Sequence, residues 1–376
     1  FSKSNTGINY STKVLGWTLT VDPIQKAINN LVITDTLMPE LMMTDAQFGA
    51  LEVKRGGVLM SKGVGEDYTI TKTVIAGKIK GYKISFASGL VINQAAYTVD
   101  YETVMDPDVL SNNGNLNYSN TALFTFAGDP ESITIPITKT PTIPDIVKHN
   151  GSKSGILDGA NKKINWTINT NHLSKNINGF ELTDVMVGNQ KLVTGSIKIY
   201  NYELNPAGGI VLGEPVDTTV AGFVITEASD GSNFKITYPT SINKPYRITY
   251  STEFVGISQT VYQNTAVTNK NESYSANVSY ADGDKFVSKI GTLNGIESVD
   301  WKVTMNKSQS TISSYTLTDT LSEGLKLIED SFIIKKLDGT VVPFDSMLIL
   351  KVRPRVLATD PQVFDLVSKA PISETY

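Results

Sequence analysis

The sequence contains no cysteine and only two histidines among its 376 residues. Without cysteine the chain cannot form disulfides, zinc–thiolate sites or iron–sulfur clusters, and it has no cysteine nucleophile. The histidines, His149 and His172, fall in a predicted linker and a predicted turn, and neither has a recurring partner, so we expect both at the surface. We therefore expect no metal site and no cofactor.

A basic excess and a long apolar run are also missing. Asp and Glu together number 37 against 33 Lys and Arg, which gives a formal net charge of -4. This balance does not suit a phosphate backbone or an anionic membrane. No run approaches the roughly 18 apolar residues of a membrane span, and the opening FSKSNTG is unlike a signal peptide. We expect no nucleic-acid partner, no membrane insertion by this segment and, if the protein is secreted, a mature segment without signal or anchor.

The chain does contain an internal repeat. Three segments align, LGWTLTVDPIQKAINNLVITDTL from Leu15, INWTINTNHLSKNINGFELTDVM from Ile164 and VDWKVTMNKSQSTISSYTLTDTL from Val299. Each holds one of the three tryptophans, Trp17, Trp166 and Trp301, and each has an aspartate 18 residues later, at Asp35, Asp184 and Asp319. The offsets of 149 and 135 residues between tryptophans indicate the domain period.

Apolar residues alternate with polar ones around each tryptophan, which is typical of a strand with one face on a core. Turn signals such as Asn-Gly, Asp-Gly and Gly-Gly separate many such short runs, and long helical periodicity is missing. These patterns predict an all-β protein of tandem immunoglobulin-like β-sandwich domains, with the tryptophans in the cores.

The repeat predicts three domains, residues 1–138, 139–283 and 284–376. The join after the first carries Pro141 and Pro144 and is expected to be short and stiff. In the third domain we find no match to the later strands after Asp319, so we interpret it as truncated or divergent. Its tail, VRPRVLATDPQVFDLVSKAPISETY, is expected to be disordered or to pair with an open sheet edge.

A lysine precedes each tryptophan, at Lys3, Lys148 and Lys289, and an asparagine opens a late strand in the first two domains, at Asn120 and Asn264. Taken singly, such residues are more often solvated or turn-forming. Their recurrence in order, together with the W-x-[IVL], T-D-[TV]-[LM] and N-T-A strands, resembles the Gram-positive cell-wall adhesin domains related to the collagen-binding region of the staphylococcal collagen adhesin. The resemblance covers the first two domains and the first third of the third.

In that family a lysine amine attacks an asparagine carboxamide to form an intramolecular isopeptide bond, assisted by a buried acid. The resemblance implies a Lys3–Asn120 bond assisted by Asp35 and a Lys148–Asn264 bond assisted by Asp184. Lys289 and Asp319 form an incomplete third site, because no asparagine follows Asn306. Burial suits this chemistry, since it favours a neutral amine and a protonated acid.

The resemblance implies a bacterial cell-surface adhesin or load-bearing stalk on a Gram-positive cell wall. Its partner would be an extracellular matrix protein or another surface ligand, and the chain would be a monomeric segment of a longer, cell-wall-anchored protein. It would not be an enzyme, because each crosslink forms once. The alternatives are a pilus-like or surface-layer subunit and a carbohydrate-binding module. A glycoside hydrolase would need paired carboxylates, which one recurring aspartate per domain does not supply.

Overall fold

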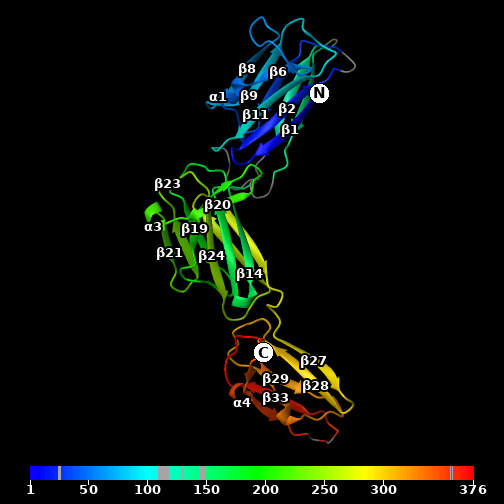
Figure 1. Ribbon diagram of the computed structural model, residues 1–376, viewed down its shortest axis with the longest axis vertical. Helices are drawn as coiled ribbons and strands as arrows, with labels where there is room; N and C mark the ends of the chain where they lie inside the picture. The colour runs from blue at the N-terminus through cyan, green and yellow to red at the C-terminus, as the bar shows by residue number, and fades with distance from the viewer. Residues whose placement is uncertain (24–26, 109–117, 129–130, 144–148, 356, 358) are drawn as a thin grey trace.

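The computed structural model describes residues 1–376 except 24–26, 109–117, 129–130, 144–148, 356 and 358. Within these residues most of the regular secondary structure consists of antiparallel strands, so the predicted all-β sandwich class is confirmed. The strands fall into three groups that follow one another along the long axis of the molecule (Figure 1). We call these groups the first, second and third units.

The first unit contains two facing sheets. The tryptophan sheet has the order β1-β2-β11-β6-β7, with β5 also paired to β11, and the aspartate sheet has the order β13-β12-β4-β9-β8. Its elements are β1 Ser2–Asn9, β2 Val14–Val21, β3 Ile28–Asn29, β4 Val32–Leu37, β5 Leu41–Met42, α1 Asp45–Gly49, β6 Glu52–Arg55, β7 Val58–Leu59, β8 Tyr68–Ile75, β9 Lys78–Phe86, β10 Val91–Ile92, β11 Tyr97–Met105, β12 Asn120–Phe126 and β13 Ile133–Lys139.

The second unit repeats this plan. Its tryptophan sheet has the order β14-β15-β24-β19-β20, with β18 also on β24, and its aspartate sheet has the order β21-β22-β17-β25-β26. Its elements are β14 Gly151–Asp158, η1 Gly159–Asn161, β15 Lys163–Thr170, β16 Ile177–Asn178, β17 Glu181–Met186, β18 Gln190–Leu192, β19 Lys198–Leu204, β20 Ile210–Pro215, α3 Thr218–Ala221, β21 Val224–Glu227, β22 Asn233–Thr237, β23 Ser241–Ile242, β24 Tyr246–Phe254, β25 Val261–Thr268 and β26 Ser273–Ser279.

The third unit has fewer strands. Among its described residues β27 pairs only with β28, and a separate sheet has the order β29-β33-β32. Its elements are β27 Val287–Asn294, β28 Ser298–Met305, β29 Thr316–Thr320, η2 Glu329–Ser331, β30 Ile334–Lys335, β31 Val341–Val342, α4 Phe344–Met347, β32 Leu348–Val352 and β33 Val363–Ser368.

Alternation of side chains decides which face of each strand enters a core. In β2 the inward residues are Leu15, Trp17, Leu19 and Val21, each at most 2% exposed. Trp166 is equally buried, at 1%. The prediction of core tryptophans is therefore confirmed for these two and wrong for Trp301, which is 47% exposed. The reason is that, among the described residues, β28 has only β27 as a strand neighbour, whereas β2 and β15 each have two.

Part of the tail of the third unit forms strand β33, which agrees with the expected pairing to a sheet edge and not with the alternative of disorder. β33 pairs with β29 so that Phe364 lies opposite Asp319, as Phe234 lies opposite Asp184 in the second unit. The sequence comparison missed this match because β33 and β22 share a pattern of alternation rather than a motif. The third unit thus has counterparts of β21 and β22 in β32 and β33.

Candidate functional site: a buried lysine, aspartate and asparagine between the sheets

The site of the first unit lies where its two sheets face each other. Lys3 enters from β1 of the tryptophan sheet and Asp35 from β4 of the aspartate sheet. The Lys3 Nζ lies 2.5 Å from Asp35 Oδ2, and both side chains are fully shielded from solvent. A lysine at this position of an edge strand points inward because it shares the pleat of Leu19, its partner on β2.

Asn120 completes this cluster from the next strand of the aspartate sheet. It lies opposite Leu37 on β4, two residues from Asp35 and on the same buried face. A tyrosine that sequence reasoning missed joins the two polar groups. The Tyr101 hydroxyl donates to Asp35 Oδ2 at 2.7 Å and accepts from Asn120 Nδ2 at 2.9 Å. The structure therefore brings together all three residues predicted for this site.

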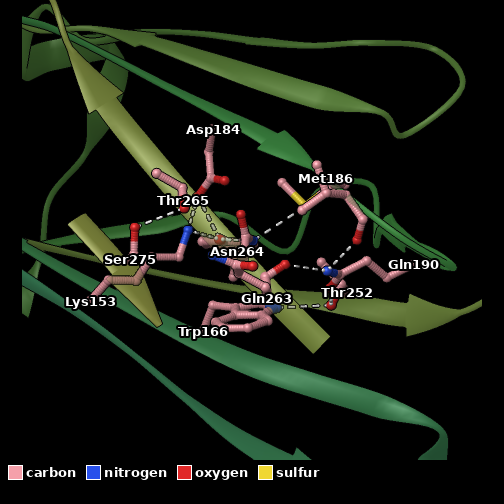
Figure 2. A network of polar contacts seen from close by, with 12 residues as sticks. Lys153, Trp166, Asp184, Met186, Gln190, Thr252, Gln263, Asn264, Thr265 and Ser275 are labelled. Atoms are coloured by element: carbon pink, nitrogen blue, oxygen red, sulfur yellow. Dashed lines mark hydrogen bonds and ion pairs between the residues drawn. The ribbon is translucent and has the colours of Figure 1, made fainter. Parts of the chain in front are cut away.

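The second unit reproduces the cluster with one different lysine. Lys153, on β14, forms an ion pair with Asp184, and its Nζ donates to the Tyr250 hydroxyl at 2.8 Å. The same hydroxyl donates to Asp184 Oδ2 at 2.5 Å and accepts from Asn264 Nδ2 at 2.8 Å. Figure 2 shows Lys153 and Asp184 converging beside Asn264.

Lys148, the lysine predicted for this site, lies outside the described residues, and Lys153 occupies the position assigned to it. The strand register explains why Lys153 lies at this position. Lys3, Lys153 and Lys289 each lie opposite the residue two positions after the tryptophan, namely Leu19, Ile168 and Val303. A signal was present in the sequence, because these lysines precede their tryptophans by 14, 13 and 12 residues, whereas Lys148 precedes Trp166 by 18.

The tyrosines could also have been found from spacing. Tyr101 and Tyr250 both follow the site aspartate by 66 residues. Each lies opposite the tryptophan on the neighbouring strand, in the pairs Tyr101 with Trp17 and Tyr250 with Trp166. A buried tyrosine needs a partner for its hydroxyl, and here both tyrosines find one in the ion pair.

Each tryptophan covers the lysine of its own unit. The Lys3 Nζ lies 5.5 Å from the centroid of the Trp17 ring, and the Lys153 Nζ lies 5.4 Å from that of Trp166. A cation over an indole face is stabilised by the ring quadrupole. Each indole Nε1 donates at 2.9 Å to a buried threonine, Thr103 or Thr252. The ring orientation is thereby fixed over the amine.

Burial shifts the protonation of the site. It lowers the pKa of Lys3 to about 8, although Asp35 opposes the shift, and it lowers the pKa of Lys153 to about 8 against the opposition of Asp184. Burial also raises the pKa of Asp35 above its ordinary value, again against the effect of the neighbouring lysine. Both shifts favour an uncharged amine beside an uncharged acid.

Two acceptor oxygens in each cluster lack a donor among the described residues. They are the Oδ1 atoms of Asp35 and Asn120 in the first unit, and those of Asp184 and Asn264 in the second. A buried acceptor without a donor costs about 1–3 kcal/mol. In the first unit, protonation of Asp35 would supply one donor and remove one acceptor without a partner, which agrees with the raised pKa of Asp35.

The third unit contains the same lysine and aspartate in an open setting. Lys289 Nζ lies 2.7 and 2.5 Å from the two carboxylate oxygens of Asp319 and 4.2 Å from the Trp301 ring centroid. The side chains of Lys289 and Asp319 are 29% and 15% exposed. No tyrosine or asparagine of the described third unit joins this pair in a hydrogen bond.

A cavity of about 490 Å³ lies between the first and second units. Tyr10 and Lys13 line it from the first unit, and His172 and Lys244 line it from the second. Tyr10 also packs in one apolar cluster with Leu173, Tyr202 and Leu204, and its backbone N–H donates to Pro206 O at 3.1 Å.

The prediction that both histidines are surface residues is right for His149 and wrong for His172, which is 1% exposed. His172 is bonded through Nδ1 to Tyr202, and burial, with a smaller effect of Arg247, lowers its pKa to about 4. The turn that carries it is covered by this interface, which a turn signal in the sequence does not reveal.

Metal-ligand groups and membrane-spanning helices were also sought among the described residues. No group of three His, Asp or Glu side chains among them is placed to hold a metal ion. None of the helices in the described part of the chain combines the length and apolarity that crossing a membrane would take.

Fold and site together define a tandem β-sandwich protein with a buried Lys–Asp–Tyr–Asn cluster in each of its first two units. Residues 148–279, about a third of the chain, match the family described as collagen binding domain. The resemblance predicted from the sequence is thereby confirmed for the second unit. No curated protein matches the chain.

Several solved structures are similar to it. The collagen-binding domain from a Staphylococcus aureus adhesin is 18% identical, with 35% of this chain and 97% of that chain covered and a TM-score of 0.29. The collagen binding subdomain of the Enterococcus faecalis surface protein ACE is 14% identical over the same shares, also at 0.29. The collagen adhesin of S. aureus is 12% identical, covering 81% of this chain and 94% of that one at 0.29.

Replacing Thr103 by valine should destabilise the first unit by about 1–3 kcal/mol, because the Trp17 indole N–H would lose its only described acceptor in a dry core. Thr103→Ser keeps the hydroxyl and serves as the matched control. Scanning calorimetry of the full chain should show a lower transition temperature for Thr103→Val than for Thr103→Ser. Equal or reversed temperatures would contradict this account of the indole hydrogen bond.

Proposed function

We propose that this chain is a segment of a Gram-positive cell-surface adhesin that binds extracellular collagen and carries two intramolecular amide crosslinks. The observation that carries the adhesin assignment is the match of residues 148–279 to the collagen binding domain family. The chain is also similar to the collagen binding subdomain of the Enterococcus faecalis surface protein ACE and to a collagen-binding domain from a Staphylococcus aureus adhesin. The segment would act outside the cell, and its crosslinks would form once each rather than through turnover.

The crosslinks would join Lys3 to Asn120 and Lys153 to Asn264. The neutral lysine amine attacks the asparagine Cγ, a C–N amide bond forms, and the carboxamide nitrogen leaves as ammonia. The protonated aspartate polarises the carboxamide and passes a proton to the departing nitrogen, while the nitrogen of lysine gives up its proton to the carboxylate. Atoms balance as amine plus carboxamide giving amide plus ammonia.

Three features support this proposal. The lysine and aspartate of each complete unit are in contact and buried. Burial lowers the pKa of Lys3 and of Lys153 and raises the pKa of Asp35, which favours their uncharged forms. The tyrosine hydroxyl holds the carboxamide nitrogen next to the acid in both units. The tryptophan excludes water from the amine, which keeps it nucleophilic.

Each bond would tie the first strand of a unit to a late strand of the facing sheet. A disulfide that closes a loop of about 100 residues stabilises by roughly 4–5 kcal/mol in the chain-entropy model, and an amide of similar span should act alike. Such a bond would also keep the two sheets together under tension, because β1 or β14 could not peel away without breaking it.

Intact mass tests the crosslinks and the identity of the second lysine. The full chain should be lighter than its sequence by two molecules of ammonia, and Lys3→Arg and Lys153→Arg should each restore one. Lys148→Arg is the matched control and should leave both losses in place. A wild-type chain with the mass computed from its sequence would contradict the crosslink proposal. If Lys148→Arg prevents the loss of one ammonia and Lys153→Arg does not, Lys148 is the lysine that forms the second bond.

The rate of crosslinking should fall as pH rises above about 8. The reactive state, with neutral lysine and protonated aspartate, holds the same number of protons as the ion pair, so the rate should not change while that number is constant. Because the lysine pKa is about 8, the lysine–aspartate pair loses one proton above this pH. The pair then has a neutral amine and a charged carboxylate, and no acid is left to protonate the departing ammonia.

Ammonia loss can be followed by mass spectrometry after a chain translated in vitro into urea is diluted into buffers of different pH. Tyr250→Phe should slow the second loss and leave the first unchanged, because it removes the hydroxyl that holds Asn264 at Asp184. A rate that keeps rising with pH, or a Tyr250→Phe chain that reacts as fast as wild type, would contradict the roles assigned to the acid and the tyrosine.

Collagen binding is proposed for the cavity between the first and second units, where a rod-shaped ligand could touch both. The full chain should bind immobilised triple-helical collagen and lose that binding when the collagen is heat-denatured. Tyr10→Ala should weaken binding by about tenfold, because Tyr10 packs the two units together. The control Phe286→Ala removes an aromatic ring in the third unit and should bind as wild type. Equal binding to denatured collagen would overturn the ligand assignment.

A pilus-like or surface-layer role and a carbohydrate-binding role stay predictions, since no contact among the described residues favours either. Electrophoresis of the native assembly under reducing, denaturing conditions separates the first from an adhesin, because a covalent polymer would give a ladder and a monomeric segment a single band.

A further inference from the structure

The cavity between the first and second units contains a buried side chain with one polar atom left unpaired. His172 lines this cavity and is 1% exposed. Its Nε2 atom has no hydrogen-bond partner among the described residues. Buried polar atoms in folded proteins are hydrogen-bonded in the great majority of cases. The unpaired nitrogen therefore indicates that a group from outside the chain completes the site.

The other ring nitrogen of His172 decides what kind of group that is. Nδ1 is bonded to the Tyr202 hydroxyl, which has no other partner in the described part of the chain. Burial raises the pKa of Tyr202, so the hydroxyl keeps its proton, and burial lowers the pKa of His172 to about 4, so the ring is neutral at physiological pH. The hydroxyl then donates to Nδ1 and the ring proton lies on Nε2. The unpaired atom is thus a donor, and it needs an acceptor oxygen.

A lysine at the same cavity provides a second, independent observation. Lys13 comes from the first unit, is half-buried, and donates from Nζ to Ser174 Oγ at 3.2 Å. Burial lowers the pKa of Lys13, and no acid among the described residues opposes this shift. A charge that is partly removed from water is normally paired. The lysine therefore favours an anion as the missing partner.

The other charged groups of the cavity agree with an anionic ligand. Lys244 and Glu203 also line it, and both are exposed. Two lysines thus face one glutamate, and the glutamate is in solvent, where its charge is screened. The exposed Lys244 can attract an anion toward the cavity before contact is made.

The cavity also has an apolar wall, which limits what can carry the anion. Val211 and Leu212, on β20, are 55% and 45% exposed and line it together with Tyr10. β20 lies at the end of the second unit that is nearest to the first (Figure 1). A collagen triple helix presents proline-rich Gly-X-Y repeats, whose rings suit such a surface, and its X and Y side chains point outward. An acidic side chain at one of these positions would reach the donors while the rings contact the apolar wall.

We propose that this cavity is a subsite for one acidic side chain of a triple-helical ligand, whose carboxylate is bound by Lys13 and by the Nε2–H of His172. The inference rests on the proposed function, because it specifies which part of a collagen ligand the cavity recognises. One carboxylate oxygen accepts from the ammonium and the other from the imidazole, and both hydrogen bonds are charge-assisted. The ligand supplies the acceptor that His172 lacks and the counter-ion that Lys13 lacks.

Two triple-helical peptides test the subsite. Both have Gly-Pro-Hyp repeats on either side of one guest triplet, which is Gly-Glu-Hyp in the first peptide and Gly-Gln-Hyp in the second. The full chain should bind the glutamate peptide about tenfold more tightly than the glutamine peptide, because only the carboxylate pairs with the lysine. The dissociation constants are measured by titration calorimetry.

Variants of the full chain assign this preference to the cavity. Lys13→Met should abolish it, and Lys13→Arg, which keeps the charge, should retain it. The matched control Lys191→Met removes one exposed lysine opposite Glu253, at the far end of β24 from the cavity, and should also retain it. A preference that Lys191→Met abolishes as fully as Lys13→Met would overturn the subsite, since general charge attraction would then explain the selectivity.

Nitrogen-15 labelling of histidine tests the other donor, because the chain has only two histidines. His149→Gln identifies the signal of His172. The Nε2 proton of His172 should move downfield when the glutamate peptide is added, and an unchanged signal would remove His172 from the site.

The outcomes separate this inference from the proposed function. If both peptides bind the wild-type chain equally well, the acidic subsite is refuted while collagen binding stands. If neither peptide nor immobilised collagen binds, the collagen proposal itself falls, and the subsite falls with it.

Discussion

The structure depends on an ion pair taken out of water in each complete unit. Burying two charges costs several kcal/mol per ion, and attraction between them offsets this only with good geometry and further hydrogen bonds. Here one hydroxyl, from Tyr101 or Tyr250, binds the aspartate and the carboxamide, and an indole face covers the amine. The cluster can persist because both sheets close over it, so the sandwich and the site require each other.

Comparison of the three units shows that burial of the lysine–aspartate pair depends on the strands around it and not on the pair itself. The third unit holds the same lysine, aspartate and tryptophan in the same register, yet its lysine and aspartate side chains are partly exposed. The difference lies in the neighbouring strands rather than in the residues. Desolvation, which shifts the protonation of Lys3 and Lys153, therefore comes from strands that are distant in sequence and carry the tyrosine and asparagine.

The site also suits a protein that bears load between its ends. The proposed covalent tie between the first strand and a late strand would lie across the two sheets, where shear would otherwise separate them. The join between the first and second units is of a different kind, since it consists of apolar packing around Tyr10, a backbone hydrogen bond from Tyr10 to Pro206 and a side-chain hydrogen bond from Lys13 to Ser174. The units would therefore stay folded under forces that let them move relative to one another, which fits binding of a rod-like ligand between them.

The sequence by itself determined the strand class and the three tryptophan strands, because alternation and fixed spacing are local signals, and the family resemblance pointed to Lys3, Asp35 and Asn120. Pairing register between strands decided which other residues join the sites and which strands correspond between units. It placed Lys153 at Asp184, brought in Tyr101 and Tyr250, and aligned β33 with β22. Burial of His172 and exposure of Trp301 likewise depended on neighbours far along the chain, since a residue's pattern fixes the face it occupies but not what covers that face.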